Sequence, residues 1–474
     1  AREMTMAEPP SPENEVLRGR MAALLVGIAS LRGSTSETIE QAQEALSYLP
    51  PDDLDSRARV LVAQGTACAY EDRSLEAEQA WRQAVQLALE SGNPFLAAAA
   101  IELLAGMQIY HQGRLREGAL ALQRVLDLGT AADGSLLPFT TTTHALLADV
   151  FLEWNDQEGA ASYLDKGIEL MQRGGIAYGL PHTYCAKARL ARAREDRQGA
   201  RKALQAAKEA VSALPMWHII VHQAACQTRL HLWMGDVDEA VHWARFCKES
   251  SECALPATLP LYLGEVQSLS LARVCLARGQ VDEARETLAE VISGASSAGR
   301  TAHLIEAHLL NALALQASGD PEAAMAALER SLFLAEPEGY MRLFLEVGEL
   351  LAPQLSRLRA WVQAQPAQRP LPEQDRLLRY ADKLLAAFAH LEPPVTLPLT
   401  AGLSSSIQEL VEPLTTRELE VLQLICAGMS NRQVADRLTI TLNTVKKHAS
   451  NIYGKLEVQS RAQAIVRARD LGLC

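Results

Sequence analysis

The chain has 474 residues, of which 48% are hydrophobic and 22% charged, and its formal net charge is −12 at pH 7. No stretch approaches the roughly 18 uninterrupted apolar residues that a membrane-spanning helix requires, so the sequence predicts a soluble, globular protein with no membrane partner. The first 15 residues are polar and rich in proline, and we predict that residues 1–15 are disordered.

One segment near the start of the chain has some features of a signal peptide. Residues 21–31 are apolar and follow Arg18 and Arg20, but no small-residue cleavage site comes after them, which favours a packed helix over a signal peptide. Eight cysteines are scattered without CxxC spacing, a pattern typical of reduced thiols in a long cytoplasmic chain. We therefore expect a cytoplasmic protein, associated with the nucleoid if it binds DNA.

An internal repeat dominates residues 16–390. A turn residue is followed five positions later by a small residue, and successive turn residues are 39 to 44 positions apart. The pairs are Gly33/Thr38, Asp72/Ala77, Gly113/Gly118, Asn155/Ala160, Glu195/Ala200, Gly235/Ala240, Gly279/Ala284 and Gly319/Ala324. A unit of this length with one tight turn is a helix hairpin, and hairpins in series bury their faces against their neighbours. The sequence predicts an all-α, right-handed α-solenoid of tetratricopeptide type with about eight hairpins.

Two further segments follow the repeats. Residues 339–390 have the pattern of one or two closing helices, interrupted by a proline-rich stretch at 365–372. Residues 391–411 are rich in Pro, Ser and Gly, a composition typical of a flexible linker.

The last segment, residues 412–474, has the pattern of four short helices. Three begin with a capping box, in which a hydroxyl and a Glu or Gln three residues later satisfy backbone N–H groups reciprocally. The three boxes are Thr415/Glu418, Ser430/Gln433 and Ser460/Gln463. Gly428 lies where the chain must leave the first helix. Because only a short turn separates the helices predicted at 430–438 and 441–456, they form a helix-turn-helix pattern.

The helix at 441–456 is amphipathic. Val445, Ala449, Ile452 and Leu456 form one apolar stripe that faces a small core. The residues that point away from the stripe are Asn443, Lys446, Lys447 and Ser450, near the N-terminal half of the helix. That is the end of a recognition helix expected to meet base edges in the major groove. Two lysines on a short helix could also be a solvated face, but the caps, the turn and the stripe together favour DNA binding.

The string LTTRELEVLQLICAGMSNRQVADRLTITLNTVKKHASNIYGKLEV, residues 414–458, resembles the LuxR-type helix-turn-helix of bacterial transcription regulators. The matching elements are LTxRE, G-x-S-N, I/V-A-x-x-L, TVKxH and KL, and Thr441 stands where the family usually has a serine N-cap. The resemblance implies that Lys446, Lys447 and Ser450 approach base edges, although some relatives carry a basic residue where Ser450 lies. It implies contacts with or near phosphates for Arg432, Asn443, Thr444 and Lys455.

The charges divide unevenly along the chain. From residue 411 onward there are nine Lys and Arg and six Asp and Glu, a net charge of +3, whereas the remainder carries −15. An acidic body repels DNA, so double-stranded DNA should bind only to the C-terminal segment. Because that basic surface is small, we expect specific binding to need a dimer or higher oligomer on repeated half-sites.

The order of solenoid, linker and LuxR-type segment resembles the large ATP-binding regulators of the LuxR family. This resemblance implies a solenoid that senses a small-molecule inducer or a regulatory protein. In that family a nucleotide-binding module precedes the solenoid, but no GxxxxGK[ST] motif occurs here, so we predict no ATP site and no cofactor in these residues. The chain begins with Ala. We expect either a fragment of a longer regulator, whose ATP-binding module lies upstream, or a product that works without nucleotide; a separate ATPase that supplies the module in trans is a third hypothesis.

Catalytic and metal sites find little support in the sequence. His218 and His222 have the i, i+4 spacing of zinc ligands, but no HExxH glutamate lies between them, so ordinary packed histidines are favoured. Trp217, Trp233 and Trp243 could line an effector groove, or they could pack between hairpins. We expect no enzyme. The leading hypothesis is a transcription regulator, and the alternative is an interaction scaffold whose C-terminal helices bind protein.

Overall fold

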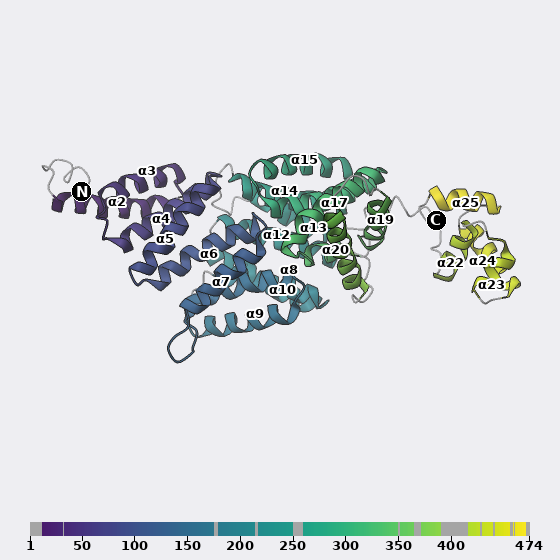
Figure 1. Ribbon diagram of the computed structural model, residues 1–474, viewed down its shortest axis with the longest axis horizontal. Helices are drawn as coiled ribbons and strands as arrows, with labels where there is room; N and C mark the ends of the chain where they lie inside the picture. Colours follow the sequence, from purple (N-terminus) through teal and green to yellow (C-terminus); the bar gives the residue numbers. More distant parts are fainter. Residues whose placement is uncertain are drawn as a thin grey trace. The chain divides into compact units, whose positions relative to one another are not determined.

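The computed structural model describes residues 12–31, 33–174, 179–213, 217–249, 259–348, 351–364, 371–389, 416–426, 429–438, 441–455, 458 and 460–470. The chain forms two compact units, residues 1–399 and 400–474, which are treated separately below. The regular elements within these ranges are helices (Figure 1), apart from one isolated bridge between Thr130 and Leu136. The predicted all-α class is confirmed.

The first unit is a series of helix hairpins (Figure 1). The pairs are α2 (Pro12–Leu31) with α3 (Thr35–Tyr48), α4 (Leu54–Tyr70) with α5 (Ser74–Glu90), α6 (Pro94–Tyr110) with α7 (Leu115–Leu128), α8 (Thr141–Glu153) with α9 (Gln157–Gln172), α10 (Leu180–Ala193) with α11 (Arg197–Ala213), α12 (Trp217–Met234) with α13 (Val237–Glu249), α14 (Leu261–Ala277) with α15 (Val281–Ser297), and α16 (Thr301–Ala317) with α17 (Pro321–Ala335). These are the eight hairpins that the repeat predicts. Helix α2 begins at Pro12, a few residues before the predicted start of the solenoid at residue 16.

Every predicted turn residue adopts the left-handed conformation. The φ values are 71° at Gly33, 60° at Asp72, 72° at Gly113, 62° at Asn155, 57° at Glu195, 90° at Gly235, 73° at Gly279 and 78° at Gly319. The residue after the turn commonly donates its N–H to a carbonyl five positions back, as Arg73 does to Cys68 at 2.9 Å. This Schellman arrangement satisfies carbonyl groups that the helix end leaves without partners, and glycine adopts it without a Cβ clash.

The small residue five positions after each turn is buried where the two helices of a hairpin cross. Thr38 is 1% exposed, Gly118 is buried, and Ala77, Ala160, Ala200, Ala240, Ala284 and Ala324 are each 0% exposed. A larger side chain at these positions would push the helices apart, because protein interiors are close-packed.

The solenoid also folds back on itself. The N–H of Ala302, at the start of α16, donates to the carbonyl of His111 at 3.1 Å, at the end of α6. Arg300 pairs with Asp72 at 2.6 Å, across 228 positions of sequence. The second and third hairpins therefore contact the beginning of the eighth, which closes the array around an interior space.

The segment after the last hairpin enters this interior. It contains a 3₁₀ turn (Glu336–Glu338) and α18 (Arg342–Leu345), and residues 340–347 are buried. The N–H of Met341 donates to the carbonyl of Glu153 at 2.7 Å, and the Trp154 indole donates to the carbonyl of Glu338 at 2.9 Å. We call residues 336–348 the lumen segment. The sequence predicted only closing helices here.

Two closing helices do follow, α19 (Leu351–Ala364) and α20 (Leu371–Ala389). The predicted interruption extended to residue 372, whereas α20 already includes Pro372, which the first turn of a helix tolerates because its missing N–H would have no partner there. The predicted linker at 391–411 lies outside the described residues. Among the residues that the structure does describe, no helix is long and apolar enough to cross a membrane.

The second unit contains α22 (Thr416–Cys426), α23 (Asn431–Leu438), α24 (Leu442–Lys455) and α25 (Arg461–Asp470). All four helices contribute buried side chains to one core, including Val421, Val434, Val445 and Ala464, each 0% exposed. The core therefore fixes how α24 is rotated about its own axis.

Candidate functional site

Local capping sets where the two central helices of the second unit begin. The Ser430 N–H donates to Gln433 Oε1 at 2.8 Å and the Gln433 N–H returns to Ser430 Oγ at 3.4 Å, as the predicted capping box requires. Thr441 Oγ1 accepts from the N–H of Thr444 at 3.2 Å, so Thr441 caps α24 in place of the family's usual serine.

Only part of each of the other two predicted capping boxes lies among the contacts of the described residues. The Gln463 N–H donates to Ser460 Oγ at 3.3 Å at the start of α25. Thr415, of the first box, and Gly428, the predicted turn residue, lie outside the described residues.

The apolar stripe of α24 packs as predicted. Val445 is 0% exposed, Ala449 5% and Ile452 0%, while Leu456 lies outside the described residues. Because the stripe is buried, the opposite face of α24 is turned to solvent.

That outer face carries the residues for which the sequence predicted contacts with bases. Lys446, Lys447 and Ser450 are exposed, and neither lysine makes an ion pair with any residue that the structure describes. Asn443 is exposed near the start of the helix, where the backbone N–H groups and the helix dipole also favour a phosphate. Thr444 is half-buried, and its hydroxyl lies 2.8 Å from that of Thr441.

Other basic residues of the second unit support the fold instead. Arg417 donates to the carbonyl of Leu438 at 3.0 Å and thereby joins the start of α22 to the end of α23. Arg461 donates to the carbonyls of Ile425 and Met429, at 3.1 and 2.5 Å, and so holds the turn before α23.

Lys455 also has a structural partner. Its ammonium lies 2.8 Å from a carboxylate oxygen of Glu418, and the two side chains are 17% and 5% exposed. Glu418 is the residue predicted to cap α22, so the ion pair joins that helix to the end of α24. An ammonium group has three hydrogens, so an ion pair with one carboxylate does not by itself prevent a second hydrogen bond. The contact between Lys455 and a phosphate stays a prediction.

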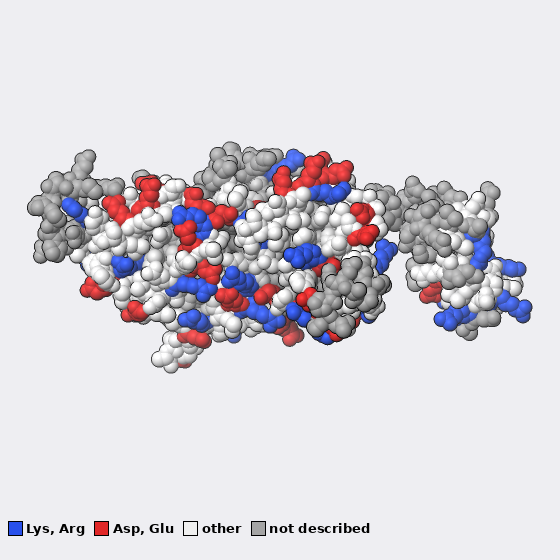
Figure 2. Space-filling model, turned by 45° about the horizontal axis from the view of Figure 1, so that its top comes forward, with Lys and Arg blue, Asp and Glu red and all other residues white. Residues whose placement is uncertain are grey.

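Helix α23 carries two further exposed cations. Arg432 was predicted from the LuxR resemblance, whereas Arg437 was not singled out by the sequence pattern. Both project from the helix that precedes α24 and make no ion pair within the described part of the chain. On the face drawn in Figure 2, the second unit shows several basic side chains and few acidic ones, whereas both kinds mix over the first unit.

Trp233, one of the three tryptophans predicted for an effector groove, packs inside the first unit. Trp233 is 3% exposed and packs in a core cluster with Ala188, Ala200 and Leu230, and the Arg197 guanidinium lies 5.7 Å from its ring centre. The structure thus places Trp233 in the packing role that the sequence left open.

Trp243 lies at the surface opening of a pocket. Trp243 is 5% exposed, lines a surface opening together with Lys208 and His242, and has the Lys208 ammonium 5.6 Å from its ring centre. The side chain of Trp217 lies outside the described residues. An effector groove at these tryptophans stays a prediction.

His218 and His222 are packed among other aromatic rings. His218 Nδ1 lies 2.9 Å from the hydroxyl of Tyr70, and the ring centre of His222 lies 5.1 Å from that of Tyr110. Burial lowers the pKa of His218 to about 3 and that of His222 well below its ordinary value. Among the described residues no cluster of three His, Cys, Asp or Glu has the geometry of a metal site.

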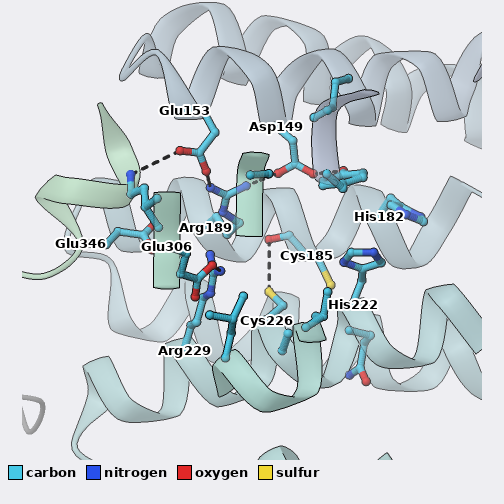
Figure 3. A pocket seen from close by; sticks show the side chains of 18 of the residues that line it. Asp149, Glu153, His182, Cys185, Arg189, His222, Cys226, Arg229, Glu306 and Glu346 are labelled. Atoms are coloured by element: carbon cyan, nitrogen blue, oxygen red, sulfur yellow. Dashed lines mark hydrogen bonds and ion pairs between the residues drawn. The ribbon is translucent and has the colours of Figure 1, made fainter. Parts of the chain in front are cut away.

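The sequence pattern missed a cavity of about 160 Å³ inside the first unit (Figure 3). We call it the lumen cavity; its charged lining includes Asp149, Glu153, Arg189, Arg192, Arg229, Glu306 and Glu346. One signal was available. Asp149, Arg189, Arg229 and Arg273 each lie six residues before a turn residue, in four successive hairpins. Charged residues recurring at one position of otherwise apolar helices indicate a shared interior wall.

Comparison with known proteins gives two family matches. Residues 19–361 match the model described as "MalT-like TPR region", and residues 412–468 match "Bacterial regulatory proteins, luxR family". The first match covers more than half of the chain.

Curated relatives extend over both units. The chain is 28% identical over 480 residues to "HTH-type transcriptional regulator MalT" of Yersinia pestis (strain Pestoides F), covering 99% of this chain and 51% of that protein. The protein of the same name from Yersinia enterocolitica is 28% identical over 483 residues, with the same coverage of each chain. The chain thus spans about half the length of these relatives.

One solved structure is the TPR domain of P58(IPK), with 14% identity, a TM-score of 0.20, and coverage of 79% of this chain and 99% of that one. A score this low supports no structural argument, so the assignment depends on the family matches. The chain belongs to the MalT-like TPR family and carries a luxR-family domain at its C-terminal end.

Proposed function

We propose that this chain is a DNA-binding transcription regulator, in which the luxR-family unit binds double-stranded DNA and the solenoid responds to an effector or a partner protein. The observation that carries the proposal is the outer face of α24. Lys446 and Lys447 project from a helix whose opposite stripe is buried, and both are exposed without an ion pair to any described residue.

The chemistry of this face suits duplex DNA. A lysine can donate to guanine O6 and N7 in the major groove, and each good base contact contributes about 1–3 kcal/mol of discrimination. Ser450, one turn further along, can donate or accept, so it fits either kind of base edge. Arg432, Asn443, Thr444 and Lys455 are the proposed contacts with phosphates.

The proposal includes self-association on DNA. The second unit offers few cations, and the rest of the chain is acidic, so one copy should bind weakly at physiological salt. We expect two or more copies to bind neighbouring half-sites. The effector would act by shifting an equilibrium between states that differ in their ability to pair on DNA.

Fluorescence anisotropy with labelled promoter fragments tests the proposal. The full chain should bind selected fragments and lose sequence-specific binding when Lys446→Ala and Lys447→Ala are combined. Lys202→Ala, at an exposed lysine of α11, is the matched control and should leave binding unchanged. If the double variant binds as the parent does, or if the chain binds only protein partners, the scaffold alternative is favoured instead.

A further inference from the structure

The lumen cavity has an acid-rich side. The guanidinium of Arg189 lies between two carboxylates, bonded to Asp149 at 2.7 Å and paired with Glu153 (Figure 3). The hydroxyl of Tyr110 also donates to Asp149, at 2.6 Å. Burial raises the pKa of Glu153 even though Arg189 opposes that shift. Two carboxylates thus share one cation, so this side can accept another positive group.

At a second part of the wall two arginines surround one carboxylate; Arg229 lines the cavity, whereas Arg273 is not one of the lining residues. Glu306 accepts from both Arg229 and Arg273, the latter at 2.7 Å. Burial opposes ionisation of Glu306, but the two arginines outweigh it and lower its pKa to about 2. Two guanidinium groups share one carboxylate here, the reverse of the arrangement at Arg189. This side can accept another negative group.

The lumen segment supplies a third cluster of the same kind. Glu346, 3% exposed, lies 3.1 Å from Arg192 and 3.8 Å from Arg342. Burial again opposes ionisation, and Arg192 leads the neighbours that lower the pKa of Glu346 to about 2. Two guanidinium groups thus surround one carboxylate at Glu346, which lines the cavity. Glu346 also belongs to the lumen segment, which leads out of the solenoid.

Two of the histidines that line the cavity, His182 and His222, add no charge. Burial lowers the pKa of His182 and lowers that of His222 well below its ordinary value, so both rings are neutral near pH 7. The field inside the cavity is set by an excess of carboxylates around Arg189 and an excess of guanidinium groups around Glu306 and Glu346.

We propose that the lumen cavity binds a small zwitterion of the α-amino acid class, with its ammonium against Asp149 and Glu153 and its carboxylate against Arg229 and Arg192. The inference rests on the proposed function, in which such a ligand is the effector. The volume of about 160 Å³ has space for roughly ten water-sized groups, which suits an amino acid of about ten non-hydrogen atoms.

Charge separation distinguishes this ligand from an uncharged polyol of equal size. A polyol would make hydrogen bonds to groups that are already paired, whereas a zwitterion offers a full charge to each side. Charge-assisted hydrogen bonds are about twice as strong as neutral ones. A ligand with net charge would satisfy one side and be repelled by the other.

The site also suggests how binding reaches the rest of the chain. Tyr340, Leu343 and Glu346 of the lumen segment line the cavity. The N–H of Leu343 donates to Glu153, on the acid-rich side, at 3.3 Å. A bound ammonium near Glu153 therefore lies beside a contact that holds the lumen segment in the interior.

Isothermal titration calorimetry of the full chain with each of the twenty common amino acids tests the proposal, with glucose and glycerol as uncharged probes. At least one amino acid should bind at one per chain, and the uncharged probes should not. For the amino acid that binds, the N-acetyl derivative lacks the ammonium and the amide lacks the carboxylate. Each should bind about tenfold more weakly or worse.

Two variants localise the binding. Ala225→Leu fills part of the cavity without removing a charge and should abolish binding, whereas Ala289→Leu, at an exposed position of α15, should not. Differential scanning calorimetry of both variants checks folding. Undiminished binding to folded Ala225→Leu, binding of the uncharged probes instead, or no binding by any amino acid overturns the proposal.

The readout separates this inference from the proposed function. Calorimetry measures the cavity without DNA, and anisotropy measures DNA binding without ligand. A chain that binds promoter DNA but no amino acid overturns the inference alone. A chain that binds an amino acid but no DNA upholds the cavity and overturns the proposed regulator.

Discussion

Replacing Arg300 by methionine should destabilise the first unit at the point where the solenoid contacts itself. The Arg300 side chain is 3% exposed, donates twice to Glu265 at 2.7 and 2.6 Å, and pairs with Asp72 at 2.6 Å. Methionine keeps much of the volume but removes both guanidinium contacts from the Glu265 carboxylate, which still lies 2.6 Å from Nδ1 of His303.

The expected magnitude follows from burial. Removing one partner of a buried ion pair costs about 3–5 kcal/mol, because the other charge is left without compensation. The side chain of Asp72 is 22% exposed, so water compensates part of the ion pair that Asp72 loses. The expected loss of unfolding free energy is therefore at the lower end of this range, about 3 kcal/mol. That is a large fraction of the roughly 5–15 kcal/mol that stabilises a typical domain.

Urea unfolding followed by circular dichroism measures this loss. Arg285→Met, at an exposed arginine of α15, is the matched control and should change the midpoint little. Adding Glu265→Gln to Arg300→Met should recover much of the stability, because the buried charge that lost its guanidinium partner is then removed as well. If Arg300→Met unfolds at the same urea concentration as Arg285→Met, the contact does not hold the solenoid closed.

Three further outcomes are expected. Gly113 and Gly92 both have φ near +72°, but only at Gly113 would an added Cβ meet the backbone nitrogen of Ala302, at 2.9 Å. Gly113→Ala should therefore lower the melting temperature more than Gly92→Ala does. Equal losses would refute the close approach. The pKa of His218 is lowered to about 3, so the unfolded chain binds a proton that the folded chain does not, and calorimetric stability should be full above about pH 6.5 and fall as the pH drops below it. A flat profile from pH 7 to 5 would contradict this. Arg432→Ala, at a proposed phosphate contact with an exposed side chain on α23, should reduce the slope of log affinity against log salt by about 0.9, and an unchanged slope would refute that contact.

Local rules explain why the hairpins could be predicted from sequence. A left-handed turn selects glycine, and the crossing point five residues later selects a small side chain, so each pair carries its own signal. Asp72, Asn155 and Glu195 show that non-glycine residues also adopt the turn, at φ near 60°. These three positions could be recognised from the repeat spacing, whereas their residue types alone would not have indicated a left-handed turn.

The helix-turn-helix was predictable for a similar reason. Its caps and its stripe are local features, and the structure places Ser430, Thr441 and Val445 in the roles expected from spacing. The partner of Lys455 was not predictable, because Glu418 lies 37 positions away and had a local role as a capping residue.

The lumen cavity could not be assembled from sequence because its parts come from hairpins that are distant along the chain. The contact between His111 and His303 spans 192 positions, and that between Arg192 and Glu346 spans 154. Both depend on how far the solenoid turns per repeat, which is the sum of many small rotations that no single residue encodes. The charged residues recurring in successive hairpins were visible, but their convergence was not.

The orientation of α24 is the claim on which the proposed function depends, and photo-crosslinking to DNA tests it most directly. A photoreactive residue is placed at position 450, on the exposed face of α24, or at position 423, an exposed position of α22. Mixed with a promoter duplex, the chain labelled at position 450 should crosslink to bases of the major groove, and the chain labelled at 423 should not. Crosslinks from 423 with none from 450 would show that another face of the unit meets the duplex.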